Sequence, residues 1–148
     1  MDRTTCGYLA GISGGIVMNI WNLFDYYVLH ISQIRFLDWA IVLLTLAKPE
    51  NVFVTVLGLI IQIIVWDGFL GIIFAHLIVP ITSQGVVYKS TFYGVLLWFI
   101  FKVIVNLYKV PVLSGMQPFP GGISNLLAII LWGIILGIVL NKFNEKLT

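Results

Sequence analysis

The sequence predicts an all-α integral membrane protein, a bundle of four transmembrane helices forming a single membrane domain over residues 1–148. Composition is the first reason: 60% of the residues are hydrophobic, 9% are charged, and the mean hydropathy is +1.06. Ordinary soluble domains carry about 25% charged residues, so a soluble fold of this length could not bury so much apolar surface. The second reason is that four apolar segments are each long enough to cross a bilayer core, which takes about 20 helical residues.

These four segments lie at residues 7–31, 52–79, 87–108 and 121–141. All five prolines fall between them. Because proline interrupts helix interiors, this is the distribution that four continuous helices require.

The connection between the first two spans contains a further apolar segment, residues 36–47, which is too short to cross. We expect a short interfacial or re-entrant helix here, with an ordered loop as the alternative. Arg35 and Asp38 are three positions apart, so they are expected to pair on one face of such a helix.

The second and fourth spans share a short repeat. Trp66 is followed by Leu70-Gly71, and Trp132 is followed at the same spacing by Leu136-Gly137. This spacing is compatible with two tandem helical hairpins related about the membrane normal, and chance similarity between apolar segments explains it equally well.

Lysine and arginine residues predict the orientation. Four lie on the side of the two termini and three lie on the other side. Because the cytoplasmic side carries more Lys and Arg, this excess of one residue favours cytoplasmic termini in a multi-pass protein of the cell membrane. The first group is Arg3, Lys89, Lys142 and Lys146, and the second is Arg35, Lys48 and Lys109. The net charge of +2 is too small to indicate nucleic acid as a partner.

Small residues recur at every fourth position along one face of the first span. They are Gly7, Gly11 and Gly15, and Gly133 and Gly137 repeat the spacing in the fourth span. Glycines at this spacing let another helix approach closely, so packing between helices is the expected role of all five.

Polar residues continue the glycine face of the first span, namely Asn19, Asn22 and Asp25. A carboxylate within a span costs at least ~2.5 kcal/mol on insertion scales, so it normally faces protein or water and has a partner. Asp67 and Lys102 are charged residues of the second and third spans, and a rise of ~1.5 Å per residue places them and Asp25 within about 8 Å along the membrane normal.

Lys102 is therefore predicted to contact a carboxylate, with Asp67 as the favoured partner and Asp25 as the second. Three interpretations stay open: an ion pair that only fixes helix packing, a polar site for an ion, proton or solute, and a Lys102 that extends to the far interface. Gln62 lies well away from Asp67 at helical spacing, so the second span is expected to be polar on two faces and to pack centrally.

No metal or cofactor is predicted. Cys6 is the only cysteine, which excludes an internal disulfide and a cysteine-based metal site. His30 and His76 lie near opposite membrane surfaces, and no metal-ligand pair has i, i+3 or i, i+4 spacing. Motifs for metalloproteases, serine hydrolases and phosphate-binding loops are also absent from the sequence, which argues against an enzyme.

The stretches GISGGIVMNIW (residues 11–21) and RFLDW (residues 35–39), with the second span around Gly71, resemble a family of small uncharacterised bacterial four-span membrane proteins. The resemblance covers nearly the whole chain. It implies a bacterial cell membrane and a four-helix fold, and it transfers no function.

Three functions stay open. The first is a transporter, channel or channel-like subunit for a small solute or ion, with a polar lining of Asn19, Asn22, Asp25, Gln62, Asp67 and Lys102. The second is a non-catalytic scaffold or accessory subunit whose polar groups only specify helix packing. The third is a membrane enzyme acting on a lipid-like substrate. The expected partners are the lipid bilayer and further copies of the chain, bound through the glycine-lined faces as a homo-oligomer.

Overall fold

The computed structural model describes residues 2–81 and 84–145, and all regular secondary structure within these ranges is helical, as predicted. The elements in order are α1 (Arg3–Phe24), the π-helical segment η1 (Asp25–Leu29), α2 (Phe36–Thr45), α3 (Val52–Ile61), the π-helical segment η2 (Gln62–Asp67), α4 (Gly68–Ile81), α5 (Val86–Leu107) and α6 (Phe119–Glu145). Because α3, η2 and α4 follow one another without a break, they form one long helix.

Of the described helices, three are long and apolar enough to cross a membrane: Val52–Val79, Val86–Leu107 and Phe119–Phe143. They match three of the four predicted spans and identify a helical membrane protein. The helix α1 has 22 residues and is also long enough, but it is not among the three. Its glycines and asparagines lower its hydropathy, so the predicted count of four spans is not confirmed by length and composition.

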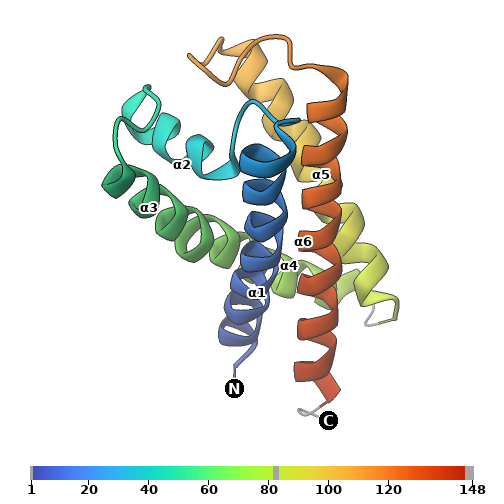
Figure 1. Ribbon diagram of the computed structural model, residues 1–148. Coiled ribbons are helices and arrows are strands. Elements are labelled where there is room, and N and C mark those ends of the chain that lie inside the picture. The colour runs from blue at the N-terminus through green and yellow to red at the C-terminus, as the bar shows by residue number, and fades with distance from the viewer. Residues whose placement is uncertain (1, 82–83, 146–148) are drawn as a thin grey trace.

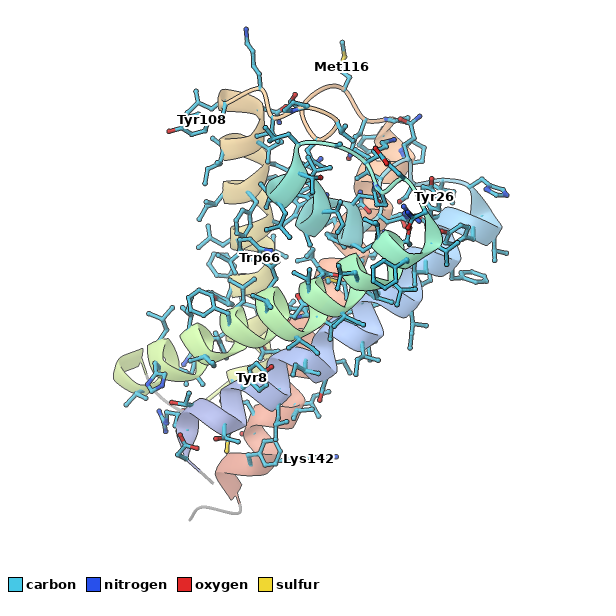
Figure 2. All side chains as sticks on the ribbon, turned by 90° about the vertical axis from the view of Figure 1, so that its left-hand side faces the viewer. Tyr8, Tyr26, Trp66, Tyr108, Met116 and Lys142 are labelled. Carbon is cyan, nitrogen blue, oxygen red and sulfur yellow. The ribbon has the colours of Figure 1, made fainter. Side chains whose placement is uncertain are left out.

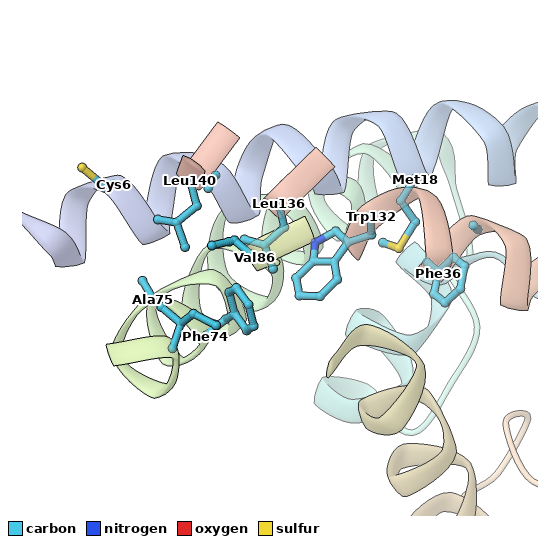
Figure 3. Packing of buried hydrophobic residues seen from close by; sticks show 12 residues of the cluster. Cys6, Met18, Phe36, Phe74, Ala75, Val86, Trp132, Leu136 and Leu140 are labelled. Atoms are coloured by element: carbon cyan, nitrogen blue, oxygen red, sulfur yellow. The ribbon is translucent and has the colours of Figure 1, made fainter. Parts of the chain in front are cut away.

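The helix α1 occupies the centre of the bundle, between α4 and α6 (Figure 1). The helix α5 packs along α6, and α2 and α3 pack on each other and project to one side of α1. Both ends of the chain lie at the same end of the bundle (Figure 1). The main hydrophobic core joins α1 to α4 and α6, and Figure 3 shows Trp132 and Leu136 of α6 within it, with Met18 of α1 nearby.

Gly7, Gly11 and Gly15 of α1 lie where its backbone touches the helix formed by η2 and α4. A Cβ atom on Gly11 would lie 2.1 Å from the carbonyl oxygen of Asp67, and one on Gly71 would lie 2.3 Å from the carbonyl oxygen of Gly7. No side chain fits at such distances, so the two helices approach as closely as backbones allow.

Gly133 and Gly137 have the same surroundings in the second helix pair. Their Cβ atoms would lie 2.6 Å from the Cα of Thr91 and 2.5 Å from the Cα of Val87, both in α5. Gly71 and Gly137, which are equivalent in the sequence repeat, therefore each face the preceding long helix.

The sequence predicts a homo-oligomer through these glycine faces. Since they are filled within one chain, self-association would need other surfaces and stays a prediction.

The predicted pairing of Arg35 with Asp38 is confirmed, with 2.7 Å between Arg35 Nη2 and Asp38 Oδ1. Asp38 Oδ2 also accepts a hydrogen bond from the Arg35 backbone nitrogen at 2.9 Å and so caps the start of α2. Burial lowers the pKa of Arg35, but the hydrogen bonds and charge of Asp38 outweigh this effect and raise the pKa overall, so the guanidinium stays charged. The same guanidinium lies 5.0 Å from the ring centre of Tyr26, which holds the start of α2 against η1.

Candidate functional site

Each of the two π-helical segments contains a buried carboxylate. Asp25 is the first residue of η1 and is 0% exposed, and Asp67 is the last residue of η2 and is 4% exposed. A π-helical turn bonds residue i to i+5 and widens the helix locally, and such turns occur frequently at functional sites. Apolar periodicity does not report them, so the sequence predicts two regular helices at these points.

The π-helical turn of η2 brings Gln62 to Asp67. Gln62 Nε2 donates a hydrogen bond to Asp67 Oδ2 at 3.0 Å. In a regular α-helix these side chains would lie about 140° apart, which is why the sequence places them on separate faces. That prediction is wrong, because the wider turn puts residues five apart on one face.

A cavity of about 90 Å³ opens beside this pair, between α2, η2, α5 and α6. Gln62 and Asp67 form part of its wall, and the remaining wall is apolar and rich in aromatic residues: Phe36, Trp39, Trp66, Trp98, Phe101 and Trp132. Figure 2 shows Trp66 between the long helix that carries it and α5, where its ring meets Phe101 edge to face at 5.7 Å between ring centres. Gln62 and Asp67 are thus hydrogen-bonded polar residues in the wall of a largely apolar cavity.

The Asp67 carboxylate rests on Gly15. A Cβ atom on Gly15 would lie 2.2 Å from Asp67 Oδ2, so the glycine makes room for the carboxylate rather than only for a helix backbone. One turn further on, Asn19 Nδ2 donates to the Gly15 carbonyl oxygen at 2.8 Å. Among the described residues, Asn19 Oδ1 and Gln62 Oε1 are buried acceptors that receive no hydrogen bond.

The predicted contact between Lys102 and a carboxylate is wrong. Lys102 Nζ donates to Gln117 Oε1 at 2.9 Å and lies 5.4 Å from the ring centre of Trp39 and 5.9 Å from that of Trp98. The lysine therefore extends toward the connection before α6, where two aromatic faces and an amide solvate its charge. Asp67 instead faces Gly15 of α1.

We expect Lys102→Met and Asp67→Asn to change stability independently. Lys102→Met removes one hydrogen bond and two contacts with aromatic rings while keeping an apolar stem, for a loss of about 1–2 kcal/mol. Because the two residues share no partner, the double variant should lose the sum of the two single losses to within about 0.5 kcal/mol. A double-mutant cycle read by unfolding in detergent measures this, and a coupling above about 1 kcal/mol would mean that the two charges do interact.

A second buried polar cluster surrounds Asp25, where η1, the following loop and the first turns of α6 meet. Asp25 Oδ2 accepts hydrogen bonds from Ser32 Oγ and from Ser124 Oγ, the latter at 2.6 Å. Asn125 Oδ1 accepts from Asn22 Nδ2 at 3.2 Å and lies 3.3 Å from Ser32 Oγ. All five side chains are at most 6% exposed.

Three members of this cluster are absent from the predicted site. Ser124 and Asn125 form a polar pair near the start of the fourth span, a signal of the same kind as Asn19 and Asn22 in the first. Ser32 lies in a connection, where a serine is unremarkable. Of the predicted residues, the structure thus groups Asn22 with Asp25 and Gln62 with Asp67.

Neither Asp25 nor Asp67 has a basic partner in the part of the chain that the structure describes. The ion pair recorded there joins Arg35 and Asp38. Within residues 2–81 and 84–145, no group of three or more His, Cys, Asp or Glu side chains lies close enough to hold a metal ion. Lys146, which was counted for orientation, lies outside the described residues.

Comparison with known proteins finds no relative of this chain. No protein family, no curated protein and no solved structure matches the chain. The resemblance to small bacterial four-span proteins therefore stays a prediction.

Proposed function

We propose that the chain is a small transporter or channel-like subunit of the cell membrane, with its polar intramembrane site at Gln62 and Asp67. In this proposal α1 and η1 together form a fourth span, α2 lies at the membrane interface, and both termini are cytoplasmic. The position of both chain ends at one end of the bundle supports an even number of crossings (Figure 1).

The observation that carries the proposal is the cavity beside Asp67. A carboxylate within a span is expensive and normally has a compensating basic partner or water. Among the described residues Asp67 has no basic partner, and it borders the cavity together with Gln62. Such a group is positioned to meet a proton, an ion or a small solute that enters the cavity.

The rival function is a scaffold or accessory subunit whose buried polar groups only specify packing. The close contact of the Asp67 carboxylate with Gly15 favours it, because that contact helps to fix the register of α1 against η2 without any ligand. The two functions differ in one measurable property, which is whether water and solutes reach the cavity.

Thiol accessibility tests this difference. Replacing the buried Cys6 by serine removes the one native thiol, and Gln62→Cys then places a thiol in the cavity wall. We expect a small charged methanethiosulfonate reagent to modify Gln62→Cys in proteoliposomes, because the reaction requires a thiolate and therefore water.

Phe69→Cys and Leu136→Cys are the matched controls, one in the exposed outer surface and one in the 0%-exposed core. Both should stay unmodified, since neither lipid nor a packed core supplies water. If Gln62→Cys reacts no faster than these two variants in folded protein, the cavity is dry and the proposed transporter or channel is refuted.

A further inference from the structure

The cavity beside Gln62 and Asp67 has an apolar wall and is open to the outer surface of the bundle. These two residues are the polar members of the wall, and they are hydrogen-bonded to each other. Leu43 of α2 also belongs to the wall and is 43% exposed, so the cavity reaches the surface beside α2. An apolar group can therefore enter from the bilayer.

A cation lies at one end of this cavity. Along α5, the wall residues lie between Gly94 and Phe101, and Lys102 follows them toward the connection that precedes α6. The Lys102 ammonium lies 5.4 Å from the ring centre of Trp39 and 5.9 Å from that of Trp98, and both rings belong to the wall. The positive charge is therefore next to the cavity, at the end where α5 meets this connection.

No carboxylate of the described residues balances the charge of Lys102. The ion pair recorded in that part of the chain joins Arg35 and Asp38. The ammonium has three N–H donors, and Gln117 Oε1 accepts a hydrogen bond from it at 2.9 Å. Lys102 is half-buried, so a ligand at this end of the cavity can reach it.

The size of the cavity fits one short alkyl chain. Its volume is about 90 Å³, and since a water-sized group needs about 15 Å³ of such space, it holds roughly six groups of the size of a methylene. Octanoate has a run of methylene groups of this length and one carboxylate. A phospholipid brings two much longer chains, which the cavity does not hold.

We propose that the solute of this cavity is a medium-chain alkyl carboxylate, with its chain in the cavity and its carboxylate on the Lys102 ammonium. This inference rests on the proposed function, because it names the solute for the same cavity. An anion is selected by charge complementarity, since the charge that a ligand meets at this end of the cavity is positive. The apolar and aromatic wall takes the chain.

Protection of a thiol in the cavity wall tests the binding. The methanethiosulfonate reaction of Gln62→Cys in the Cys6→Ser chain is followed in phosphatidylcholine proteoliposomes, with and without octanoate. Bound octanoate covers the thiol, so at about ten times its Kd it should slow the reaction about tenfold. Octyltrimethylammonium has the same chain and the opposite charge, and the same concentration of it should not slow the reaction.

Two variants of Lys102 separate recognition of the charge from burial of the chain. Lys102→Met removes the ammonium and keeps an apolar side chain, so the octanoate concentration for half-protection should rise about tenfold, which corresponds to about 1.4 kcal/mol. Lys102→Arg keeps a positive charge and should keep the protection. Unchanged half-protection in Lys102→Met overturns the assignment of the carboxylate to Lys102.

Tryptophan fluorescence of the native chain gives a second readout that depends on no variant. Four of the five tryptophans line the cavity, namely Trp39, Trp66, Trp98 and Trp132. Octanoate with a bromine on its terminal carbon should quench their fluorescence to a plateau, because bromine quenches indole on contact, and excess octanoate should restore the signal. Quenching without a plateau, or equal quenching by brominated octyltrimethylammonium, overturns the proposal.

The outcomes separate this inference from the proposed function. A Gln62→Cys thiol that is unreactive even without octanoate overturns the proposed function, and the quenching of the native chain then decides whether the carboxylate binds. A thiol that reacts and that octanoate does not protect leaves the proposed function standing and overturns the alkyl carboxylate as its solute. Protection by phosphatidylglycerol in the vesicles, with none by octanoate, assigns the cavity to a bilayer lipid and overturns the single-chain solute as well.

Discussion

Gly11→Ala should destabilise the folded chain by about 3 kcal/mol or more, at or beyond the upper end of the usual cost of overpacking. The added Cβ would lie 2.1 Å from the Asp67 carbonyl oxygen and 3.1 Å from the Gly71 Cα. Both are backbone atoms and cannot rotate away, so α1 and the helix of η2 and α4 would have to separate. Thermal or denaturant unfolding of the purified chain in detergent measures the loss.

Gly122→Ala is the matched control for this prediction. Gly122 also lies in a helix, but a Cβ atom there meets nothing within 4 Å. Alanine has the higher helix propensity, so this variant should be as stable as the native chain or up to about 1 kcal/mol more stable. If the two variants behave alike, α1 and α4 are not in backbone contact.

Asn22→Leu should cost about 3 kcal/mol or more. Asn22 is 1% exposed, accepts a hydrogen bond from the Phe36 nitrogen and donates one to Asn125 Oδ1. Leucine strands the Phe36 nitrogen in the interior and leaves Asn125 Oδ1 with only Ser32 Oγ within hydrogen-bond distance. A buried polar group left without a partner costs roughly 1–3 kcal/mol, and the lost bond to Asn125 adds to this. Since Phe36 is the first residue of α2, the helix should also lose its attachment to α1.

Asn106→Leu serves as its control. Asn106 is exposed and bonds the Lys102 carbonyl oxygen and the Gly115 nitrogen, groups that water can reach when the asparagine is removed. The loss should stay below about 1 kcal/mol. Equal losses for the two variants, measured in the same detergent, would contradict the distinction between a buried and an exposed asparagine that the structure makes.

Hydropathy and proline positions predicted an all-helical chain, and the predicted count of four spans is not confirmed. Three predicted spans correspond to helices long and apolar enough to cross, and the Arg35–Asp38 pair is confirmed. These features depend on neighbours in the sequence, three or four residues apart on one helix. For the same reason, the face that joins Gly7, Gly11 and Gly15 to Asn19 and Asn22 could be identified by counting residues.

Contacts between distant parts of the chain were decided only by the tertiary structure. Depth along the membrane normal is one coordinate of three, so it could not show that Lys102 extends to Gln117 while Asp67 faces Gly15. The π-helical turns change the rotation per residue, and a regular period assigned Gln62 to the wrong face.

The composition and the lengths of the apolar segments together predicted a helical membrane protein, because a soluble fold of this length could not bury so much apolar surface. They also determined that Asp25 and Asp67 require special surroundings, since a carboxylate in an apolar interior is costly wherever it lies. Packing decided what surrounds each of them. Asp67 lies beside a cavity. Asp25 lies among oxygen atoms of Ser32, Ser124 and Asn125, which are 7, 99 and 100 positions further along the sequence. Separations of that size carry no periodicity, so only the folded chain brings these groups together.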